Sequence, residues 1–550
     1  MRVLWESGNG KREPGNGKRE SGNGNREPGT SRKMRDLHNL SMAGLAARNY
    51  QIEEYLETVC PACIAAGQSS QDNAFIDGVL ASHDGKLWMR RWCPTHGESE
   101  SLYEEDLEIW QTRSGWATPT LTVNPDRPHK RSGLSVYADG LPASHGQHTC
   151  ILLLNITENC NYACPTCYAT SLPPGTAAGS PLKPSIAELL HTVDVVIERE
   201  GGKLGVVMLS GGEPTVRPDL PELIKELAAR NITRVLINTN GRRIVRDDRF
   251  AALLAELPDR VEVFLQFDGL NREAVKTFRG EDVVQEKLTA LDRLERAQVC
   301  TTLVATVAQG VNDDQVGEVF RLGLDREFVT GVAFQPVFGS GRGSGIDPQN
   351  RVTPTGIIRR LSNAVAEVTP GDFIPLPCSH RDCCDIGYWL RTPKDGWRSV
   401  VDLVGRDELK RWIHLVSNTI SFENSKEMLA AVLKDGVLQR IFSEQNATSS
   451  AALAIDTLRM CDCVPGLHEL VDAIWKRGQK QERTMARSLF RVTVKQFMDA
   501  HTFHSARLRQ CCVHTGTFEE DPRRLSFCWR WLFPDATDFP GHESTLRVLP

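Results

Sequence analysis

This chain of 550 residues lacks the features that would assign it to several special classes of protein. Its longest apolar runs, at residues 150–154 and 206–209, are far shorter than the ~18 residues that span a bilayer. No apolar signal segment follows the N-terminus, so we expect a cytoplasmic protein. The net charge of −5 provides no basic excess for a nucleic-acid backbone, and no nucleic-acid partner is expected.

Cysteine is too sparse for a disulfide scaffold, since there are 16 cysteines in the whole chain. Most of them are nevertheless clustered in short segments. In a chain without an export signal, clustered thiols favour metal ligands over disulfides. The remaining composition is that of an ordinary globular protein, and the length predicts two to four structural units.

Two segments precede the regular part of the chain. Residues 8–28 repeat a heptapeptide, GNGKREP, with two glycines and no apolar residue per unit, which predicts a flexible, solvated tail over residues 1–35. Residues 50–112 contain two half-sites whose spacing resembles a zinc ribbon or a rubredoxin-type iron site. They predict a mononuclear Zn or Fe site with three thiolates and, as one alternative, an imidazole as the fourth ligand. These side chains are Cys60, Cys63, Cys93 and His96.

Six short β-prone runs alternate with amphipathic stretches between residues 148 and 345. The runs are residues 151–156, 206–209, 234–238, 261–267, 299–307 and 332–334. One helix is expected to begin at the capping box of Ser185 and Glu188, and another at Asn312. This alternation predicts an α/β fold with a parallel sheet, closed or partly closed as a (β/α)6 TIM-like barrel. In such barrels the chemistry gathers at the C-terminal ends of the strands.

The β/α alternation stops near residue 350, and residues 350–550 are expected to form a mostly helical domain with cysteine-bearing loops. Adjacent cysteines do not easily ligate one cluster, so one member of each pair is expected to serve a different centre or none. We predict at least one auxiliary Fe–S cluster, with two as the alternative. Its candidate ligands are Cys378, Cys383, Cys384, Cys511, Cys512 and Cys528, with His380 and His514 nearby and Cys461 and Cys463 as replacements. Cys150 and Cys300 lie on expected strands and are interpreted as core residues.

The most informative motif follows the first expected strand, where CNYACPTC presents Cys160, Cys164 and Cys167. A [4Fe–4S] cubane normally takes four thiolates, so three leave one iron open, which is typical of a catalytic metal site. The second strand ends in GGEPT, whose two glycines let the backbone approach a ligand and whose carboxylate accepts from an ammonium group. The third and fourth strands end in NTNG and QFDG. All four motifs are therefore expected at one rim of the barrel.

The combination of CxxxCxxC and GGEPT resembles the radical S-adenosylmethionine (SAM) enzymes over residues 148–340. The resemblance implies that Cys160, Cys164 and Cys167 hold a [4Fe–4S] cluster whose open iron binds SAM. In such enzymes the reduced cluster cleaves SAM to a 5′-deoxyadenosyl radical, which abstracts hydrogen from an unactivated C–H bond. The implied SAM-binding residues are Gly211, Gly212, Glu213, Asn238, Thr239, Asn240, Gln266 and Asp268. Such enzymes often place an aromatic residue before the third cysteine, where this chain has Thr166.

The overall layout resembles a narrower group, the tetraether and membrane-spanning lipid synthases. The resemblance lies in CPxC and CPxHG at the front, QHTC before the barrel and the cysteine segments after it. It implies C–C coupling of two lipid tails, peripheral contact with the inner membrane face and a low-potential donor of flavodoxin or ferredoxin type. Members of that group carry a further cysteine-rich stretch before the barrel, where this chain has only Cys150. Three alternatives remain: modification of a peptide, modification of a small cofactor precursor as in molybdenum-cofactor synthesis, and a non-catalytic iron–sulfur electron-transfer protein.

Overall fold

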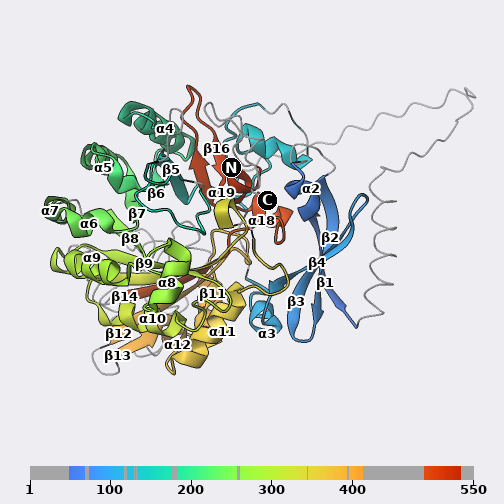
Figure 1. Cartoon of the computed structure of the whole chain (residues 1–550). Coiled ribbons are helices and arrows are strands. Elements are labelled where there is room, and N and C mark those ends of the chain that lie inside the picture. The colour runs from blue at the N-terminus through green and yellow to red at the C-terminus, as the bar shows by residue number, and fades with distance from the viewer. Residues whose placement is uncertain are drawn as a thin grey trace, which may run out of the picture. The chain divides into compact units, whose positions relative to one another are not determined.

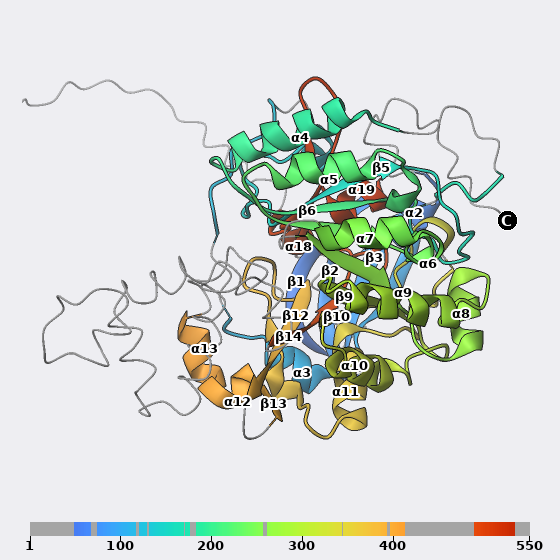
Figure 2. The same cartoon turned by 90° about the vertical axis from the view of Figure 1, so that its left-hand side faces the viewer.

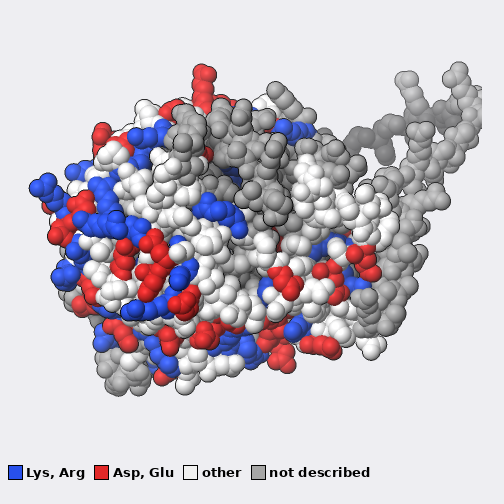
Figure 3. All heavy atoms as spheres, in the orientation of Figure 1, with Lys and Arg blue, Asp and Glu red and all other residues white. Residues whose placement is uncertain are grey.

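The structure is a computed structural model that describes most of the chain beyond the tail. The described residues are 49–67, 74–116, 120–128, 131, 133–169, 171–175, 183–256, 261–343, 345–392, 396–412 and 489–533. The heptapeptide repeats and both Cys461 and Cys463 lie outside them. Among the described residues, no helix is long and apolar enough to cross a membrane. On the face drawn in Figure 3, basic and acidic side chains of these residues are interspersed.

An antiparallel sheet of four strands begins the described part of the chain (blue in Figure 1). In order along the sheet, the strands are β1 (Gln51–Val59), β2 (Phe75–His83), β3 (Lys86–Cys93) and β4 (Gly97–Glu104). Asp84 and Gly85 both have positive φ and form the two-residue turn between β2 and β3. Helix α2 (Pro61–Ala65) follows β1, and helix α3 (Leu107–Gln111) follows β4. Asp106 caps α3, since its carboxylate accepts the N–H of Ile109.

Six parallel strands in chain order form the centre of a second sheet, which confirms the predicted α/β fold. They are β5 (Ile151–Thr157), β6 (Leu204–Gly211), β7 (Ile232–Thr239), β8 (Val261–Gln266), β9 (Thr301–Val307) and β10 (Val329–Pro336). Helices cover the outer face of this sheet (Figures 1 and 2). They are α4 (Ile186–Arg199), α5 (Leu220–Ala228), α6 (Arg242–Arg246), α7 (Asp248–Glu256), α8 (Arg272–Arg279), α9 (Val284–Arg296), α10 (Val316–Asp325) and α11 (Pro354–Ala364).

The helix starts agree with the sequence where the cap is local and differ where the capping residue has tertiary partners. Helix α4 begins at the predicted capping box of Ser185 and Glu188. Helix α10 begins later than predicted, with Gln315 at its N-cap. The Asn312 side chain instead donates to the backbone oxygens of Asp268 and Thr306, at 2.7 Å each, and so ties the ends of two strands together.

The described residues beyond 350 do not form the mostly helical domain that the sequence predicted. Strands β11 (Ile374–Pro375), β12 (Cys384–Thr392), β13 (Gly396–Ser399) and β14 (Leu489–Lys495) extend the barrel sheet beyond β10, while β15 (Val513–Gly516) and β16 (Arg524–Ser526) extend it beyond β5. Apart from α11, the helices described there are short: α12 (Val400–Val404), α13 (Arg406–Trp412), α18 (Ser505–Arg509) and α19 (Phe527–Leu532). Residues 413–488, where most of the predicted helices fall, lie outside the described residues.

The side chains that line the barrel interior form three layers, because alternate residues of a strand point to the same face. We call them the floor, the apolar belt and the polar rim, in the direction of the parallel strands. The floor contains Arg234, Glu262, Thr302 and Arg491; the apolar belt contains Leu153, Met208, Leu236, Phe264, Val304 and Ala333; the polar rim contains Asn238, Gln266, Thr306, Gln335 and Lys495. The intervening residues, such as Val263 and Leu303, pack outward against the helices.

Candidate active site and metal centres

A cavity of about 210 Å³ occupies the interior of the barrel. Its wall includes the three cysteines of the CxxxCxxC loop, the Gly211–Gly212–Glu213 segment and all three layers of the barrel interior. The structure therefore brings the motifs that follow β5, β6, β7 and β8 to one chamber. The wall also includes Cys384, which lies at the start of β12 on the far side of the sheet order from β5.

The loop that carries Cys160, Cys164 and Cys167 is held by an arginine that sequence reasoning missed. The guanidinium of Arg342 donates to the backbone oxygens of Cys164 and Ser171, at 2.9 Å each. The backbone N–H of Arg342 donates to the Cys167 oxygen at 2.9 Å. The only signal for it in the sequence was the glycine-rich stretch GSGRGSG directly after the sixth strand.

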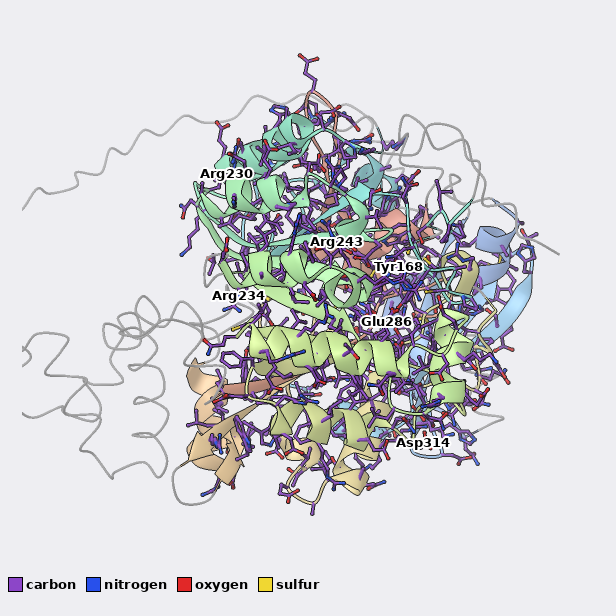
Figure 4. The ribbon with its side chains drawn as sticks, turned by 60° about the vertical axis from the view of Figure 1, so that its left-hand side comes forward. Tyr168, Arg230, Arg234, Arg243, Glu286 and Asp314 are labelled. Carbon is purple, nitrogen blue, oxygen red and sulfur yellow. The ribbon has the colours of Figure 1, made fainter. Side chains whose placement is uncertain are left out.

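The other side of the loop is fixed through Tyr162, which lies between the first and second cysteines. The Arg242 guanidinium lies 4.0 Å from the centre of the Tyr162 ring, and the Lys287 ammonium lies 5.1 Å from it. The phenol of Tyr162 donates to Glu286, which Figure 4 labels on helix α9. Burial, followed by the nearby Arg279, lowers the pKa of Lys287 to about 8.

The donor set of this loop suits an iron–sulfur cluster. The side chains of Cys160, Cys164 and Cys167 all line the cavity. Three thiolates would bind three corners of a cubane and leave the fourth iron open.

Gly211 and Gly212 are required for a different reason from the predicted close approach of a ligand. A Cβ atom on Gly212 would lie 2.2 Å from the backbone oxygen of Asn159, and one on Gly211 would lie 2.3 Å from that of Thr157. Gly211 also has φ of +120°. The N–H groups of Gly212 and Glu213 donate to those same two oxygens. The two glycines thus let the end of β6 pack directly against the chain that leads to Cys160.

Glu213 is buried in the cavity wall and holds the ends of β6 and β7 together. Its Oε1 accepts from the backbone N–H and hydroxyl of Thr215 and from the hydroxyl of Thr239, and its Oε2 accepts the N–H of Asn240 at 2.8 Å. Three of these four hydrogen bonds end on Oε1 and one on Oε2. Oε2 is therefore the oxygen that can accept from an ammonium group in the cavity.

The predicted binding residues on β7 and β8 belong to one hydrogen-bonded chain across the strand ends. Gln266 donates to Asn238 at 2.7 Å and accepts from Arg279 at 3.2 Å. Arg279 forms a bidentate pair with Asp268, at 2.6 and 2.7 Å, and lines the cavity beside Cys164. Burial lowers the pKa of Arg279, but Asp268 and Cys164 together outweigh it and hold the pKa above its usual value. The sequence pointed to Asp268 and missed its partner Arg279.

Thr166 and Tyr168 flank the third cysteine and both line the cavity. The Thr166 hydroxyl is turned to the backbone oxygen of Phe278 at 3.3 Å. The Tyr168 ring, labelled in Figure 4, packs against Phe338, Phe527 and Trp531. The aromatic side chain of this segment therefore follows the third cysteine.

The antiparallel sheet brings its four predicted ligands to one point, since both half-sites lie at the same end of the sheet. The Nδ1 atom of His96 lies 3.5, 3.3 and 3.6 Å from the sulfurs of Cys60, Cys63 and Cys93, and the sulfurs of Cys63 and Cys93 are 3.8 Å apart. All four ligand atoms lie within 4.8 Å of one another. This arrangement fits one tetrahedral ion, with His96 as the fourth ligand.

The later cysteine segments bring thiols together in two places, with Cys511 and Cys512 in different ones. The first thiol group is Cys150, Cys378 and Cys512, whose sulfurs lie within 4.8 Å of one another, with Cys378 and Cys512 at 3.8 Å. We call Cys383, Cys511 and Cys528 the second thiol group, because Cys383 and Cys511 lie near enough to Cys528 to affect its pKa. Burial raises the pKa of Cys528 to about 12, and its neighbours Cys511 and Cys383 also raise it.

Cys150 is buried in the core as predicted. The sequence missed that its sulfur also lies beside Cys378 and Cys512, which happens because strand β15 pairs beside β5. Cys300 is buried against Phe328, as a core residue is expected to be. Neither histidine joins the two thiol groups as a ligand. His514 contacts the Thr149 hydroxyl and the Cys511 backbone oxygen, and His380 accepts the N–H of Asp382.

Comparison with known proteins identifies the class of the barrel. Residues 154–323 match the model of the radical SAM superfamily, and residues 52–105 match the HMPTM N-terminal zinc ribbon domain. Residues 154–323 are therefore a radical SAM domain, and enzymes of that superfamily use a [4Fe–4S] cluster and SAM. The cavity residues described above fit that pair of cofactors.

Individual relatives differ in how much of their length the chain spans. The 7,8-dihydro-6-hydroxymethylpterin dimethyltransferase of Methanocaldococcus jannaschii is 23% identical over 87% of this chain and 93% of its own length. The mycofactocin maturase MftC of Mycolicibacterium smegmatis is 31% identical over 30% of this chain and 40% of its own length. Among solved structures, SuiB of Streptococcus suis bound to SAM has a TM-score of 0.33 at 13% identity, over 40% of this chain and 48% of that chain.

Proposed function

We propose that this enzyme abstracts hydrogen from a saturated hydrocarbon segment bound in the apolar belt, with lipid tails as the substrate class. The observation that carries the proposal is the position of the belt. It lies below the polar rim, where SAM is expected, and the cavity wall reaches from the CxxxCxxC loop to Cys384. A hydrocarbon has no group to pair with the amides of the rim, whereas the belt offers it apolar contact from Leu153 on β5 round to Ala333 on β10. Thr493 of β14 lines the cavity beside Ala333 at the same level.

The residues of this chain supply binding, orientation and the exclusion of water. Cys160, Cys164 and Cys167 would hold the [4Fe–4S] cluster, and Glu213 would accept from the amino group of SAM. When bound and reduced by a low-potential donor of flavodoxin or ferredoxin type, this pair supplies a carbon radical that removes hydrogen from an inert C–H bond. The belt keeps water and other hydrogen donors away from the reacting carbon.

The remaining metal centres belong to the same proposal. The ribbon site would hold one Zn or Fe ion, and the two thiol groups would hold auxiliary iron–sulfur clusters. The first thiol group adjoins the wall that carries Cys384, so an auxiliary centre there would face the substrate from the side opposite the CxxxCxxC loop. Coupling of two lipid tails requires one hydrogen abstraction from each tail. The auxiliary centre would hold the first carbon radical until the second tail has reacted.

Transfer of deuterium tests the proposal directly. Anaerobically reconstituted protein is incubated with SAM, dithionite and a lipid with perdeuterated tails, and 5′-deoxyadenosine is analysed by mass spectrometry. We expect deuterium in 5′-deoxyadenosine and dimerised tails among the lipids. SAM cleavage without deuterium transfer would exclude the lipid, and clusters without any SAM cleavage would indicate an electron-transfer protein.

Two near-isosteric variants on β9 separate the belt from the general core. Val304→Thr places a hydroxyl in the apolar belt, whereas Val307→Thr places one in the outer core. We expect Val304→Thr to reduce deuterium transfer several-fold while Val307→Thr affects stability alone. Because a lipid substrate also requires peripheral membrane contact, sedimentation with lipid vesicles should carry the protein down.

A second candidate is methylation of a pterin, as the name of the M. jannaschii relative suggests. It is favoured by the polar rim, where Asn238, Gln266 and Gln335 offer amide donors and acceptors suited to a heterocycle. Incubation with 7,8-dihydro-6-hydroxymethylpterin and mass spectrometry for methylated product tests it. Methylated pterin with no change in the lipids would replace the first candidate, and modification of a peptide would leave both substrates unchanged.

A further inference from the structure

An aspartate stands on each side of the adjacent thiols Cys383 and Cys384. Both aspartates, Asp382 and Asp385, are buried. The backbone at the pair is fixed by bonds from Cys383 N–H to the His380 oxygen at 2.9 Å and from Gln496 N–H to the Cys383 oxygen at 3.1 Å. Cys384 begins strand β12. Cys383 ends the turn that precedes this strand. The two thiols have different surroundings, since Arg507 lies beside Cys383 whereas Cys384 lines the cavity.

One guanidinium holds both aspartates. Arg113 lies in the turn after helix α3. We call residues 50–112 together with this turn the ribbon segment. The Arg113 guanidinium forms a bidentate contact with Asp385, at 3.0 and 2.5 Å, and lies 3.5 Å from Asp382. It also donates to Glu104 of strand β4 at 2.7 Å. The Arg113 side chain is 2% exposed and its three carboxylates are 4% exposed or less. A bidentate contact fixes direction as well as distance.

The ribbon segment holds Asp382 through two further side chains. Trp110 Nε1 donates to Asp382 at 3.0 Å, and the Tyr103 hydroxyl donates to it at 3.2 Å. These two donors and Arg113 come from β4, α3 and the turn after α3. The neighbouring Arg381 and His380 also lie 3.9 Å from the Asp382 carboxylate. The same turn residue, Arg113, binds the residue after the pair. The ribbon segment therefore binds the residues on both sides of Cys383 and Cys384.

We propose that Arg113 is a positioning residue that keeps Cys383 and Cys384 apart, so that Cys383 faces the second thiol group and Cys384 faces the first thiol group and the cavity. This role rests on the proposed auxiliary clusters and not on the identity of the substrate. By this proposal the ribbon segment helps to position the auxiliary cysteines, in addition to holding the Zn or Fe ion at Cys60, Cys63, Cys93 and His96. Lysine in place of Arg113 would retain the charge but reach only one aspartate at a time.

Iron content tests the proposal without any activity measurement. The variants are made in a parent protein in which Cys160, Cys164 and Cys167 are alanine, so that the bound iron and sulfide report the auxiliary centres. We expect Arg113→Gln to lose at least half of the auxiliary iron and sulfide and to change the electron paramagnetic resonance (EPR) spectrum of the reduced remainder. Arg113→Lys is expected to restore part of both.

Arg360→Gln is the matched control. Arg360 joins the ribbon segment to the barrel through Glu105 and Asp313, at 3.0 Å each, and touches no cysteine segment. It should leave auxiliary iron and the spectrum unchanged, and equal losses in both variants would reduce Arg113 to a docking contact. A folded Arg113→Gln protein with the parent's iron and spectrum would overturn the proposal.

A milder variant covers the case in which Arg113→Gln does not fold. Asp385→Asn keeps the side-chain volume and removes the charge that anchors the bidentate contact. We expect it to retain the ribbon ion and to change the EPR spectrum of the auxiliary centre. An unchanged spectrum would count against the proposal, as would a parent protein that binds no auxiliary iron. If no deuterium passes from the lipid to 5′-deoxyadenosine, the proposed lipid substrate is wrong. The iron content and EPR spectra expected for the Arg113 and Asp385 variants would not change.

Discussion

Gly212→Ala is expected to disable the cluster loop without unfolding the barrel. The added Cβ would lie 2.2 Å from the backbone oxygen of Asn159, and an ordinary contact begins at 3.4 Å, so one of the two segments must move by about 1.2 Å. The nearest atoms all belong to the backbone of residues 158 and 159, which cannot rotate away as a side chain does. The displacement is therefore passed to Cys160, the next residue.

Two magnitudes follow from a shift of this size. Overpacking of a dense region typically costs about 1–3 kcal/mol of unfolding free energy. A misplacement of about 1 Å at a reacting group typically costs on the order of 100-fold in rate. We therefore expect a folded protein whose rate of 5′-deoxyadenosine formation from SAM, with dithionite as reductant, falls on the order of 100-fold.

Gly343→Ala provides the matched control, because Gly343 follows β10 and contacts the same cysteine loop. A Cβ at Gly343 would lie 3.5 Å from the Thr166 oxygen, which is an ordinary contact, and the residue does not have positive φ. It should cleave SAM at nearly the wild-type rate. Wild-type cleavage by Gly212→Ala, or an equal loss in both variants, would refute the argument that the close approach of β6 positions the cysteine loop.

Four further outcomes are expected. Cys160→Ala should abolish cluster binding and 5′-deoxyadenosine formation, and undiminished SAM cleavage after all three loop cysteines are replaced would contradict the family assignment. Cys60→Ser should remove one Zn or Fe per chain, measured by elemental analysis. Burial lowers the pKa of Lys287 from 10.5 in the unfolded chain to about 8 in the folded protein, so between these pH values the unfolded chain binds more protons than the folded protein. The unfolding free energy of the wild type should therefore rise by up to about 3 kcal/mol from pH 8 to 10.5, relative to that of Lys287→Met, as measured by urea denaturation. Arg234→Met should cost about 3 kcal/mol by leaving the buried Glu262 with one fewer cation, and adding Glu262→Gln should recover part of it.

The parts of the fold that the sequence predicted are those that depend on interactions between residues close together in the sequence. Ser185 caps α4 because its partner Glu188 is three residues away, and the parallel strands follow from apolar runs separated by amphipathic helices. The meeting of the CxxxCxxC loop with GGEPT follows equally, since the ends of adjacent parallel strands share one rim. The predicted location of these motifs needed no knowledge of side-chain contacts.

The parts that were missed depend on contacts between distant residues. Strand β14 alternates buried apolar residues, Phe490, Val492 and Val494, which pack outward against the helices. This pattern is visible in the sequence, but the place of β14 beside β10 joins residues about 160 positions apart. The approach of Cys150 to Cys378 and Cys512 was missed because these two residues are more than 200 positions away. Arg279 and Arg342 act through Asp268 and backbone oxygens that no local spacing connects to them.

The first thiol group lies where the two edges of the open sheet come together, and this position relates the metal centres to the fold. Cys378 belongs to the segment between β11 and β12, beyond β10, while Cys150 and Cys512 precede β5 and β15 at the opposite edge. No described strand pairing joins these two edges, yet the sulfurs of Cys378 and Cys512 are 3.8 Å apart. A centre bound there would therefore link the two edges of a barrel that its backbone ladder leaves open. Because Arg113 fixes the neighbouring Cys384 and the cavity reaches that residue, the ribbon segment, the auxiliary centre and the substrate chamber form one connected structure.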